Sequence, residues 1–258
     1  MGRLSPAGDM LEPGLRAISS ALLSARKAAR GLPGFPGDVP ATLDEAYRVQ
    51  EASRAAWPDE IGGWKVGGVP PAYLDRFDAR SLAGPIWQKS IRVAGAGLNE
   101  MPVYDGGFAA IEPEFVFRLG TSREEDRMFI GAEIASSPVP AINDHGPAAV
   151  ICDFGNNNGL LLGPEVPDWR DRREPVAVRI DIDGKGVGAV SAGFVPALEA
   201  LAFLVALSQD RGFDLPEGTL VSSGAITGVH EAPVGAVSTV DFGDLGRFDL
   251  KLIPATPL

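Results

Sequence analysis

Glycine and proline interrupt the apolar runs of this chain at short intervals from Ile61 onward, which limits the folds open to it. The 258 residues include 32 glycines and 22 prolines. Short apolar runs separated by Gly, Pro and Asp are typical of strands joined by turns. Hydrophobic residues make up 45% of the chain and charged residues 22%, which indicates a globular protein rather than a disordered one. We therefore expect a β-rich domain over residues 61–258.

Helical patterns precede this domain. Residues 10–31 carry apolar side chains at helical spacing, at Leu15, Ile18, Leu22 and Ala25. The proline- and glycine-rich segment GLPGFPGDVP then ends the helix. Thr42 and Glu45 stand at the spacing of a capping box, which predicts the start of a second helix. The predicted organisation is a small helical N-terminal region over residues 1–60 followed by the β-rich domain, an α+β fold.

Two elements inside the β-rich domain have clear local signals. The segment VAVRIDIDGKGVGAV alternates apolar and polar residues and then turns at Asp183 and Gly184, which predicts a hairpin. The segment FVPALEALAFLVALSQDRG predicts one later helix, ended by Gly212. The runs that follow this helix again predict strands and turns.

Charge and residue counts exclude several kinds of partner. The formal net charge is −11 and no Lys/Arg cluster is interleaved with aromatic residues, so nucleic acid is not an expected partner. One cysteine, Cys152, and two histidines, His145 and His230, do not suffice for a Cys/His zinc site, so any metal is expected to have oxygen ligands. The apolar runs are too short to span a membrane and the N-terminus lacks a basic and then apolar leader, so we expect a cytoplasmic protein.

Glu112 and Glu114 lie one residue apart in the otherwise apolar segment GGFAAIEPEFVFRLG. Side chains alternate along a strand, so both glutamates point to the face opposite to the apolar side chains of Ile111, Phe115 and Phe117. Two ionised carboxylates facing a partly buried space are costly unless a cation, a shared proton or hydrogen-bond donors compensate. A divalent cation is the simplest of these solutions.

Pro113, between the two glutamates, allows a second interpretation. Proline lacks the N–H that a central strand needs, so its position favours a sheet edge or a β-bulge. The spacing alone therefore equally allows a solvated edge with two surface glutamates.

Further candidate site residues lie before and after this segment. Glu133 stands in the short apolar stretch IGAEIASSPVPAIND, and three carboxylates with waters suit Mg²⁺ or Mn²⁺, or a structural Ca²⁺. Lys65 lies between glycines in IGGWKVGGV, where it suits acid–base or anion-binding work; a lysine that extends from a strand edge into solvent is the alternative. The segments CDFGNNNGLLLG and VSSGAITG are glycine-rich turns able to present N–H groups to a small anion.

Several segments, taken in order, resemble the 2-keto-4-pentenoate hydratase group of the fumarylacetoacetate hydrolase (FAH) superfamily. They are GWKVG (63–67), IEPEFVFRLG (111–120), AEIASS (132–137), NNGLLLG (157–163), GTLVSSGAITG (218–228) and the closing DFGDLGRFDLKL. The match runs nearly end to end, and the joint order of the segments is specific at the superfamily level. The resemblance implies a mixed β-roll or β-barrel of the FAH C-terminal type, usually assembled as a homo-oligomer.

The resemblance also implies roles for individual residues. The family's metal ligands fall on Glu112, Glu114 and Glu133, with Mg²⁺ or Mn²⁺ as the cofactor, and its active-site lysine falls on Lys65. Its substrate contacts fall on Asn157, Ser223, Gly224 and Thr227.

The implied activity is chemistry on a small 2-oxo acid or its enol. As a hydratase, the protein would ketonise 2-hydroxypenta-2,4-dienoate and add water, giving 4-hydroxy-2-oxopentanoate. The alternatives are decarboxylation of a vinylogous 2-oxo diacid, C–C hydrolysis of an acylpyruvate, and a catalytically silent relative that binds a small acid. Decarboxylation predicts a basic pocket for the second carboxylate, for which Arg76, Arg80 and Lys89 are candidates.

Two departures from the family pattern concern the group that moves protons. Ser81 stands where hydratases commonly carry an aspartate, and Asp78, three residues away, is the candidate catalytic replacement. Asp153 in DFGNNNG lies one position off the usual D-N-x-S-x-G register. These departures bear on hydration and not on the metal or on 2-oxo acid binding.

Overall fold

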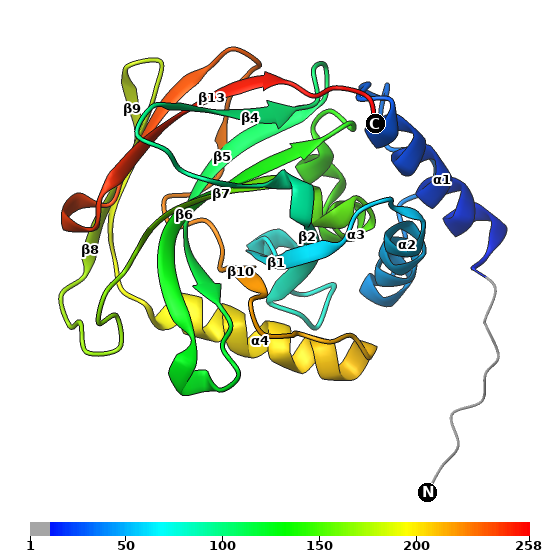
Figure 1. Ribbon diagram of the computed structural model, residues 1–258. Coiled ribbons are helices and arrows are strands. Elements are labelled where there is room, and N and C mark those ends of the chain that lie inside the picture. Colours follow the sequence, from blue (N-terminus) through cyan, green and yellow to red (C-terminus); the bar gives the residue numbers. More distant parts are fainter. Residues whose placement is uncertain (1–10) are drawn as a thin grey trace, which may run out of the picture.

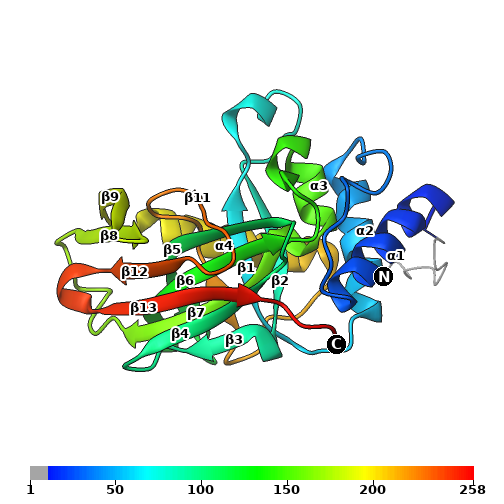
Figure 2. The ribbon, with the colours of Figure 1, turned by 90° about the horizontal axis from the view of Figure 1, so that it is seen from above.

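Two curved β-sheets form the body of the protein, and three of its helices gather at one end of them (Figure 1; Figure 2). The structure is a computed structural model that describes residues 11–258. Its α-helices are α1 (Pro13–Lys27), α2 (Leu43–Ala56), α3 (Pro147–Cys152) and α4 (Val195–Arg211). Helices α1, α2 and α3 form the group at one end, whereas α4 lies against β1 and β2.

The larger sheet carries the segments singled out by the sequence. Its strand order is β2 (Ser81–Trp87), β1 (Ile61–Gly68), β10 (Leu220–Ser222), β5 (Phe108–Arg118), β6 (Arg127–Ser137), β7 (Asn157–Glu165) and β3 (Ile91–Val93), with β11 (His230–Glu231) also paired to β5. The smaller sheet has the order β4 (Leu98–Val103), β13 (Arg247–Pro254), β12 (Val237–Asp241), β8 (Val176–Ile182) and β9 (Lys185–Ala192). The chain is therefore α+β and rich in strands, as the sequence predicts.

The main core lies between the two sheets and α4. Ile111, Phe115 and Phe117 of β5 lie in it together with residues from β6, β8, β12, β13 and α4. Side chains alternate along β5, so Glu112 and Glu114 point out of this core toward the opposite face. The predicted division of β5 into an apolar face and a carboxylate face is confirmed.

A second core joins the helices to the sheets. Ile18 and Leu22 of α1 and Val49 of α2 pack in one cluster with Phe108 at the start of β5 and Ile151 of α3. Because the cluster is continuous, the N-terminal helices pack directly on the strands that carry the glutamates. The first ten residues of the predicted helical region lie outside the described residues.

Pro113 does not mark a sheet edge or a bulge, and that prediction is wrong. β5 lies inside the larger sheet, and its pairing with β6 is unbroken from Phe108 to Arg118. On its other side, β10 pairs with β5 only from Val116 onward and β11 only up to Ile111. Pro113 lies in the gap between these two strands, where a missing N–H costs no ladder hydrogen bond.

The local signals for helix ends and turns are confirmed. In the capping box of α2, the N–H of Glu45 donates to Thr42 Oγ1 (3.2 Å) and the N–H of Thr42 donates to Glu45 Oε2 (3.2 Å). Asp183 and Gly184 connect β8 to β9 with φ values of 49° and 76°. Gly212 ends α4 with a φ of 67°. Among the described residues, no helix has both the length and the apolar character to cross a membrane.

Candidate metal centre

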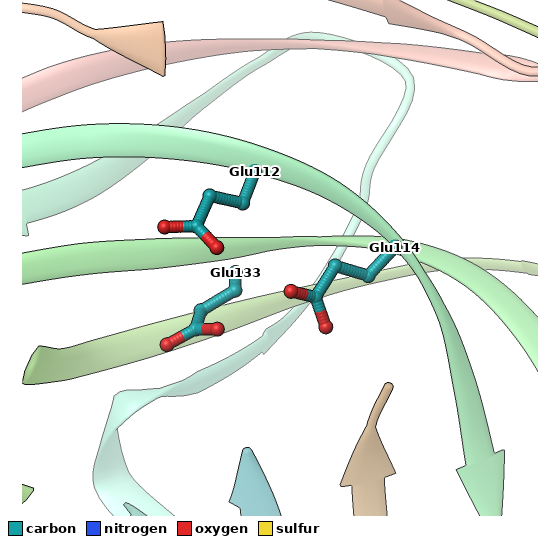
Figure 3. A group of neighbouring side chains, drawn as sticks. All are labelled: Glu112, Glu114 and Glu133. Atoms are coloured by element: carbon teal, nitrogen blue, oxygen red, sulfur yellow. The ribbon is translucent and has the colours of Figure 1, made fainter. Parts of the chain in front are cut away.

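Three buried glutamates converge on the face of β5 and β6 that points away from the main core (Figure 3). Glu112 of β5 is paired with Glu133 of β6, and Glu114 follows two residues later on the same face of β5. Each residue offers a carboxylate oxygen within 4.8 Å of the oxygens offered by the other two. Their exposed fractions are 6%, 0% and 0% for Glu112, Glu114 and Glu133. The sequence interpretation as solvated surface charges is therefore wrong.

Hydrogen bonds from two side chains and one backbone N–H hold two of these carboxylates in place. Ser222 Oγ of β10 donates to Glu114 Oε2 at 2.5 Å, and the N–H of Gly224 donates to the same oxygen at 2.8 Å. Asn157 Nδ2, at the start of β7, donates to Glu133 Oε1 at 3.0 Å. Hydrogen bonds of this kind fix the orientation of a carboxylate before any ligand binds.

Lys65 of β1 is the counter-charge of the cluster. Its Nζ lies 3.4 Å from Glu133 Oε2, and the side chain is buried. Burial alone lowers the pKa of Lys65, but the carboxylates of Glu133, Glu112 and Glu114 outweigh this effect and raise it. Lys65 is therefore an ammonium ion in the metal-free protein.

One ammonium group does not balance three carboxylates. Burial and then the nearby Glu133 raise the pKa of Glu112 to about 7, against the lowering effect of Lys65. Burial, Glu133 and Glu112 likewise raise the pKa of Glu114 well above its ordinary value. Without a cation these carboxylates therefore tend to hold protons, which a bound cation would displace.

The free oxygen atoms of the cluster fit a divalent cation. Glu114 Oε1 is buried and accepts no hydrogen bond, and the buried Glu133 Oε2 faces the Lys65 ammonium group at 3.4 Å. Buried oxygens without donors are costly unless another group binds them. An all-oxygen set of carboxylates suits hard ions such as Mg²⁺, Mn²⁺ or Ca²⁺.

A pocket of about 280 Å³ opens beside the cluster. Its polar lining consists of Lys65, Glu112, Asn143 and Asn156. The rest is glycine or apolar: Gly67, Gly68, Pro70, Leu82, Gly146, Pro147, Val150, Ala225 and Val229. The pocket is therefore small, with its charges at the glutamate end.

The backbone beneath this pocket is strained. Phe154, Gly155 and Asn156 have consecutive φ values of 57°, 67° and 68°, which residues with side chains rarely adopt. Gly84 of β2 makes this possible, since a Cβ atom there would lie 2.0 Å from the Phe154 carbonyl oxygen. Such strain persists only where the surrounding structure holds it, and it is common at functional sites.

Comparison with known proteins gives a match in structure only. No family model and no curated protein matches the chain. The 4-oxalocrotonate decarboxylase from Pseudomonas putida G7, complexed with magnesium and adipate, has a TM-score of 0.74 at 18% identity and covers 93% of this chain and 97% of its own. Fumarylpyruvate hydrolase from Pseudomonas aeruginosa, in complex with Mn²⁺ and pyruvate, has a TM-score of 0.53 at 17% identity, over 77% and 91% of the two chains. This chain has the FAH-type fold.

The four residues expected to contact substrate fall into two pairs in this fold: two bind the carboxylates, and two bind other groups. Gly224 binds Glu114 through its N–H, and Asn157 binds Glu133. Ser223 Oγ donates to the Phe115 carbonyl oxygen, whereas Thr227 Oγ1 lies 2.8 Å from His230 Nε2. None of these contacts places Ser223 or Thr227 at the carboxylates within the described structure.

Asp78 does not reach the cluster. It is exposed and lines a separate pocket with Arg76, Ser81 and Arg211. The three-residue offset from Ser81 puts it on the loop before the start of β2. The structure therefore gives no support to Asp78 as a proton-transfer group.

Three positions at the cluster and its pocket were not identified from the sequence. Val221 of β10 lies in the main core, so its neighbour Ser222 faces the glutamates, and alternation in the segment VSSG is a signal that identifies it. Asn156 and Asn143 reach the pocket through loop conformations that carry no local sequence signal.

Proposed function

We propose that the protein belongs to the 2-keto-4-pentenoate hydratase group and catalyses the metal-dependent hydration of 2-hydroxypenta-2,4-dienoate to 4-hydroxy-2-oxopentanoate. The ordered segments that resemble this group, the FAH-type fold and the buried carboxylate cluster support the proposal. We also expect it to act as a cytoplasmic homo-oligomer.

Mg²⁺ or Mn²⁺ is the proposed cofactor, held by Glu112, Glu114 and Glu133. Similar folds were solved with magnesium in a decarboxylase and with Mn²⁺ in a hydrolase, which supports the choice. When bound, such an ion supplies Lewis acidity that stabilises the enolate of a 2-oxo acid.

The protein's own residues would bind and orient the substrate. The Lys65 ammonium group lines the pocket next to Glu112, where it can attract the substrate carboxylate and hold a proton at Nζ. The amides of Asn143 and Asn156 offer hydrogen bonds to a hydroxyl group or water. Leu82, Val150 and Val229 give the remaining wall its apolar lining.

The number of basic groups in the pocket is the observation that carries the substrate choice. Lys65 is the one basic side chain among the described residues that line it. Arg76 and Lys89, expected to hold a second carboxylate, line two other pockets. The second carboxylate of a diacid would meet no second cationic side chain in this pocket, only the amides of Asn143 and Asn156 and apolar groups such as Leu82, so its charge would be poorly compensated. The pocket therefore favours a short monocarboxylate.

Decarboxylation of a vinylogous 2-oxo diacid is the second candidate. Its support is the structural similarity to 4-oxalocrotonate decarboxylase, which was solved with the diacid adipate. That similarity, at 18% identity, concerns the fold, whereas the lining of the pocket concerns the substrate. We therefore rank hydration of a monocarboxylate first.

Turnover of two substrates separates these candidates. The protein loaded with Mg²⁺ or Mn²⁺ is incubated with 2-hydroxypenta-2,4-dienoate and with 2-oxohex-3-enedioate, while ultraviolet absorbance and CO₂ are followed. The proposal predicts loss of the dienoate absorbance, formation of 4-hydroxy-2-oxopentanoate and no CO₂. Release of CO₂ from the diacid without hydration of the dienoate would establish the decarboxylase instead. Metal binding with no turnover of either compound would favour a catalytically silent relative.

A further inference from the structure

Arg26 of α1 reaches from the N-terminal helices into the body of the protein. Its side chain is 2% exposed. Nε lies 2.5 Å from Asp153 Oδ1, and Nη2 donates to Asp153 Oδ2 at 3.0 Å and to the Asp153 carbonyl oxygen at 3.1 Å. Nη1 donates to the Asn157 carbonyl oxygen at 3.0 Å, and Nη2 also donates to the Ser136 carbonyl oxygen at 3.2 Å. One guanidinium group thus joins α1, β6 and the start of β7.

The two anchors of Arg26 enclose the strained backbone. Asp153 and Asn157 flank Phe154, Gly155 and Asn156, whose φ values are 57°, 67° and 68°. The guanidinium carbon also lies 5.1 Å from the centre of the Phe154 ring, in a cation–π contact. Because left-handed backbone needs outside support, these contacts, together with the close approach of Gly84, help to hold the segment in this conformation.

The clamped segment ends at a residue that touches the metal centre. Arg26 Nη1 binds the backbone carbonyl of Asn157, and the side-chain Nδ2 of Asn157 binds Glu133 Oε1 at 3.0 Å. The contact to Ser136 lies on the same strand as Glu133, three residues further along β6. Arg26 is thereby two bonded steps from a carboxylate of the cluster without touching it.

Stability alone does not require a buried ion pair here. Replacing such pairs by apolar groups of similar size is often neutral or stabilising, whereas a bidentate arginine defines geometry. Asp153 lies one position away from the aspartate of the family motif. In this structure it is paired with Arg26 and does not line the pocket. Its position is explained by the clamp.

We propose that Arg26 is a positioning residue of the metal centre. It holds residues 153–157 so that the amide of Asn157 fixes Glu133, and it makes α1 part of the site. The proposal rests on the proposed metal-binding function, but not on which reaction the protein catalyses.

Metal affinity tests this role apart from activity. Mn²⁺ is titrated calorimetrically into metal-free wild-type protein and into two variants, Arg26→Lys and the double variant Arg26→Met/Asp153→Asn. The double variant removes both charges of the buried pair together, and it serves as the test if Arg26→Lys does not fold. Loss of residues that orient metal ligands typically costs 10- to 100-fold in affinity, so we expect a loss of about tenfold or more. Thermal unfolding of each metal-free variant is measured alongside.

Ser19→Ala is the matched control. Ser19 Oγ lies 2.7 Å from Ser53 Oγ and joins α1 to α2, with no hydrogen bond to residues 153–157. It should lower the unfolding temperature but leave Mn²⁺ affinity within about twofold, because it loosens the helix without reaching Glu133. Asn157→Ala should reproduce the affinity loss, and Arg26→Lys combined with it should add little.

The outcomes separate this inference from the proposed function. Unchanged Mn²⁺ affinity in the folded Arg26 variants, or an equal loss in Ser19→Ala, would overturn the positioning role. Wild-type protein that binds no Mn²⁺ would overturn it together with the metal centre. If wild-type protein binds Mn²⁺ but does not hydrate the dienoate, the proposed reaction is wrong. The Mn²⁺ affinities of the variants then still decide the role of Arg26.

Discussion

Adjacent serines in the segment VSSG have opposite surroundings. Ser222 Oγ binds the buried carboxylate of Glu114, whereas Ser223 Oγ binds the backbone carbonyl of Phe115. Strand alternation at β10 accounts for the difference, since consecutive side chains point to opposite faces. A single step along the chain thus decides which hydroxyl group contacts the carboxylate cluster.

Ser222→Ala should weaken Mn²⁺ binding by about tenfold, because Glu114 loses a donor that fixes its orientation. Ser223→Ala is the control and should leave the affinity within about twofold, since its hydroxyl touches no ligand. Calorimetric titration of both variants checks this. Equal losses in the two would show that the hydrogen bond to Glu114 has no special role.

Glu112 makes the stability of the metal-free protein depend on pH. Burial, and then Glu133, raise its pKa to about 7, against the effect of Lys65. The folded state therefore binds the proton more tightly than the unfolded chain does. This contribution is fully present below the ordinary glutamate pKa and is lost as the pH rises to about 7.

Urea unfolding in a metal chelator at pH 5 and at pH 7.5 measures this effect. The fall in the free energy of unfolding between these pH values should be smaller in Glu112→Gln than in wild type, by roughly 1–3 kcal/mol. An identical pH dependence in the two proteins would show that Glu112 keeps its ordinary pKa.

At the scale of single residues, the sequence predicts which side chains are candidates for the site better than it predicts which residues they contact. The apolar surroundings of Glu112, Glu114 and Glu133 make them candidate metal ligands, but the spacing equally allows a solvated edge, and the structure shows that all three are buried. The surroundings of Asp78 and Ser223 were not predictable, because a loop's direction and a hydroxyl group's partner depend on strands distant in the chain.

At the scale of elements, β2 and the Phe154–Asn156 segment approach closely because Gly84 of β2 has no side chain. A Cβ atom at Gly84 would lie 2.0 Å from the Phe154 carbonyl oxygen and 2.6 Å from the Gly155 nitrogen. These neighbours are backbone atoms, so no side-chain movement relieves the clash. The close approach places the strained segment under Lys65, since a Cβ atom at Gly155 would lie 2.9 Å from Lys65 Cδ.

Gly84→Ala should therefore destabilise the protein by about 3 kcal/mol, because one of two backbone segments must shift. Gly14→Ala in α1 is the matched control, since a Cβ atom there meets nothing within 4 Å. Alanine should leave stability unchanged or raise it by up to about 1 kcal/mol. Urea unfolding of both variants gives the comparison, and a tolerated Gly84→Ala would mean that the two segments are not in close contact.

Elements with local signals were predictable, and those that depend on pairing were not. The capping box of α2, the hairpin at Asp183 and the end of α4 at Gly212 are written in adjacent residues. The place of Pro113 was mispredicted because the gap between β10 and β11 joins segments more than a hundred residues away in sequence. The alternation of side chains along a strand predicts which face of the sheet a residue lies on, but not which strand pairs with it.

At the scale of the whole molecule, the site is built from parts that are distant in the chain. The glutamates come from β5 and β6, Lys65 from β1, and the support for Glu114 from β10 and the residue after it. The ordered motifs predicted this assembly only through the family resemblance, because composition and periodicity do not specify which strands pair. The role of α1 became visible only with the buried contacts of Arg26.

Because the proposed ligands come from separate strands, metal binding should stabilise the whole fold. A ligand that binds only the folded state at 100 times its Kd adds about 2.7 kcal/mol to stability. Mn²⁺ should therefore raise the unfolding temperature of wild-type protein and leave that of Glu114→Gln nearly unchanged. An equal rise in both proteins would place the bound metal elsewhere.

The most direct test of the account is a calorimetric titration of Mn²⁺ into metal-free wild type, Glu112→Gln and Glu114→Gln. Glu124→Gln, at an exposed glutamate, is the control. We predict one binding site per chain in wild type and in the control, with affinity reduced by more than about 100-fold in both site variants, because each loses an anionic oxygen ligand. Unchanged affinity in Glu112→Gln and Glu114→Gln would contradict the assignment of these carboxylates as a metal centre.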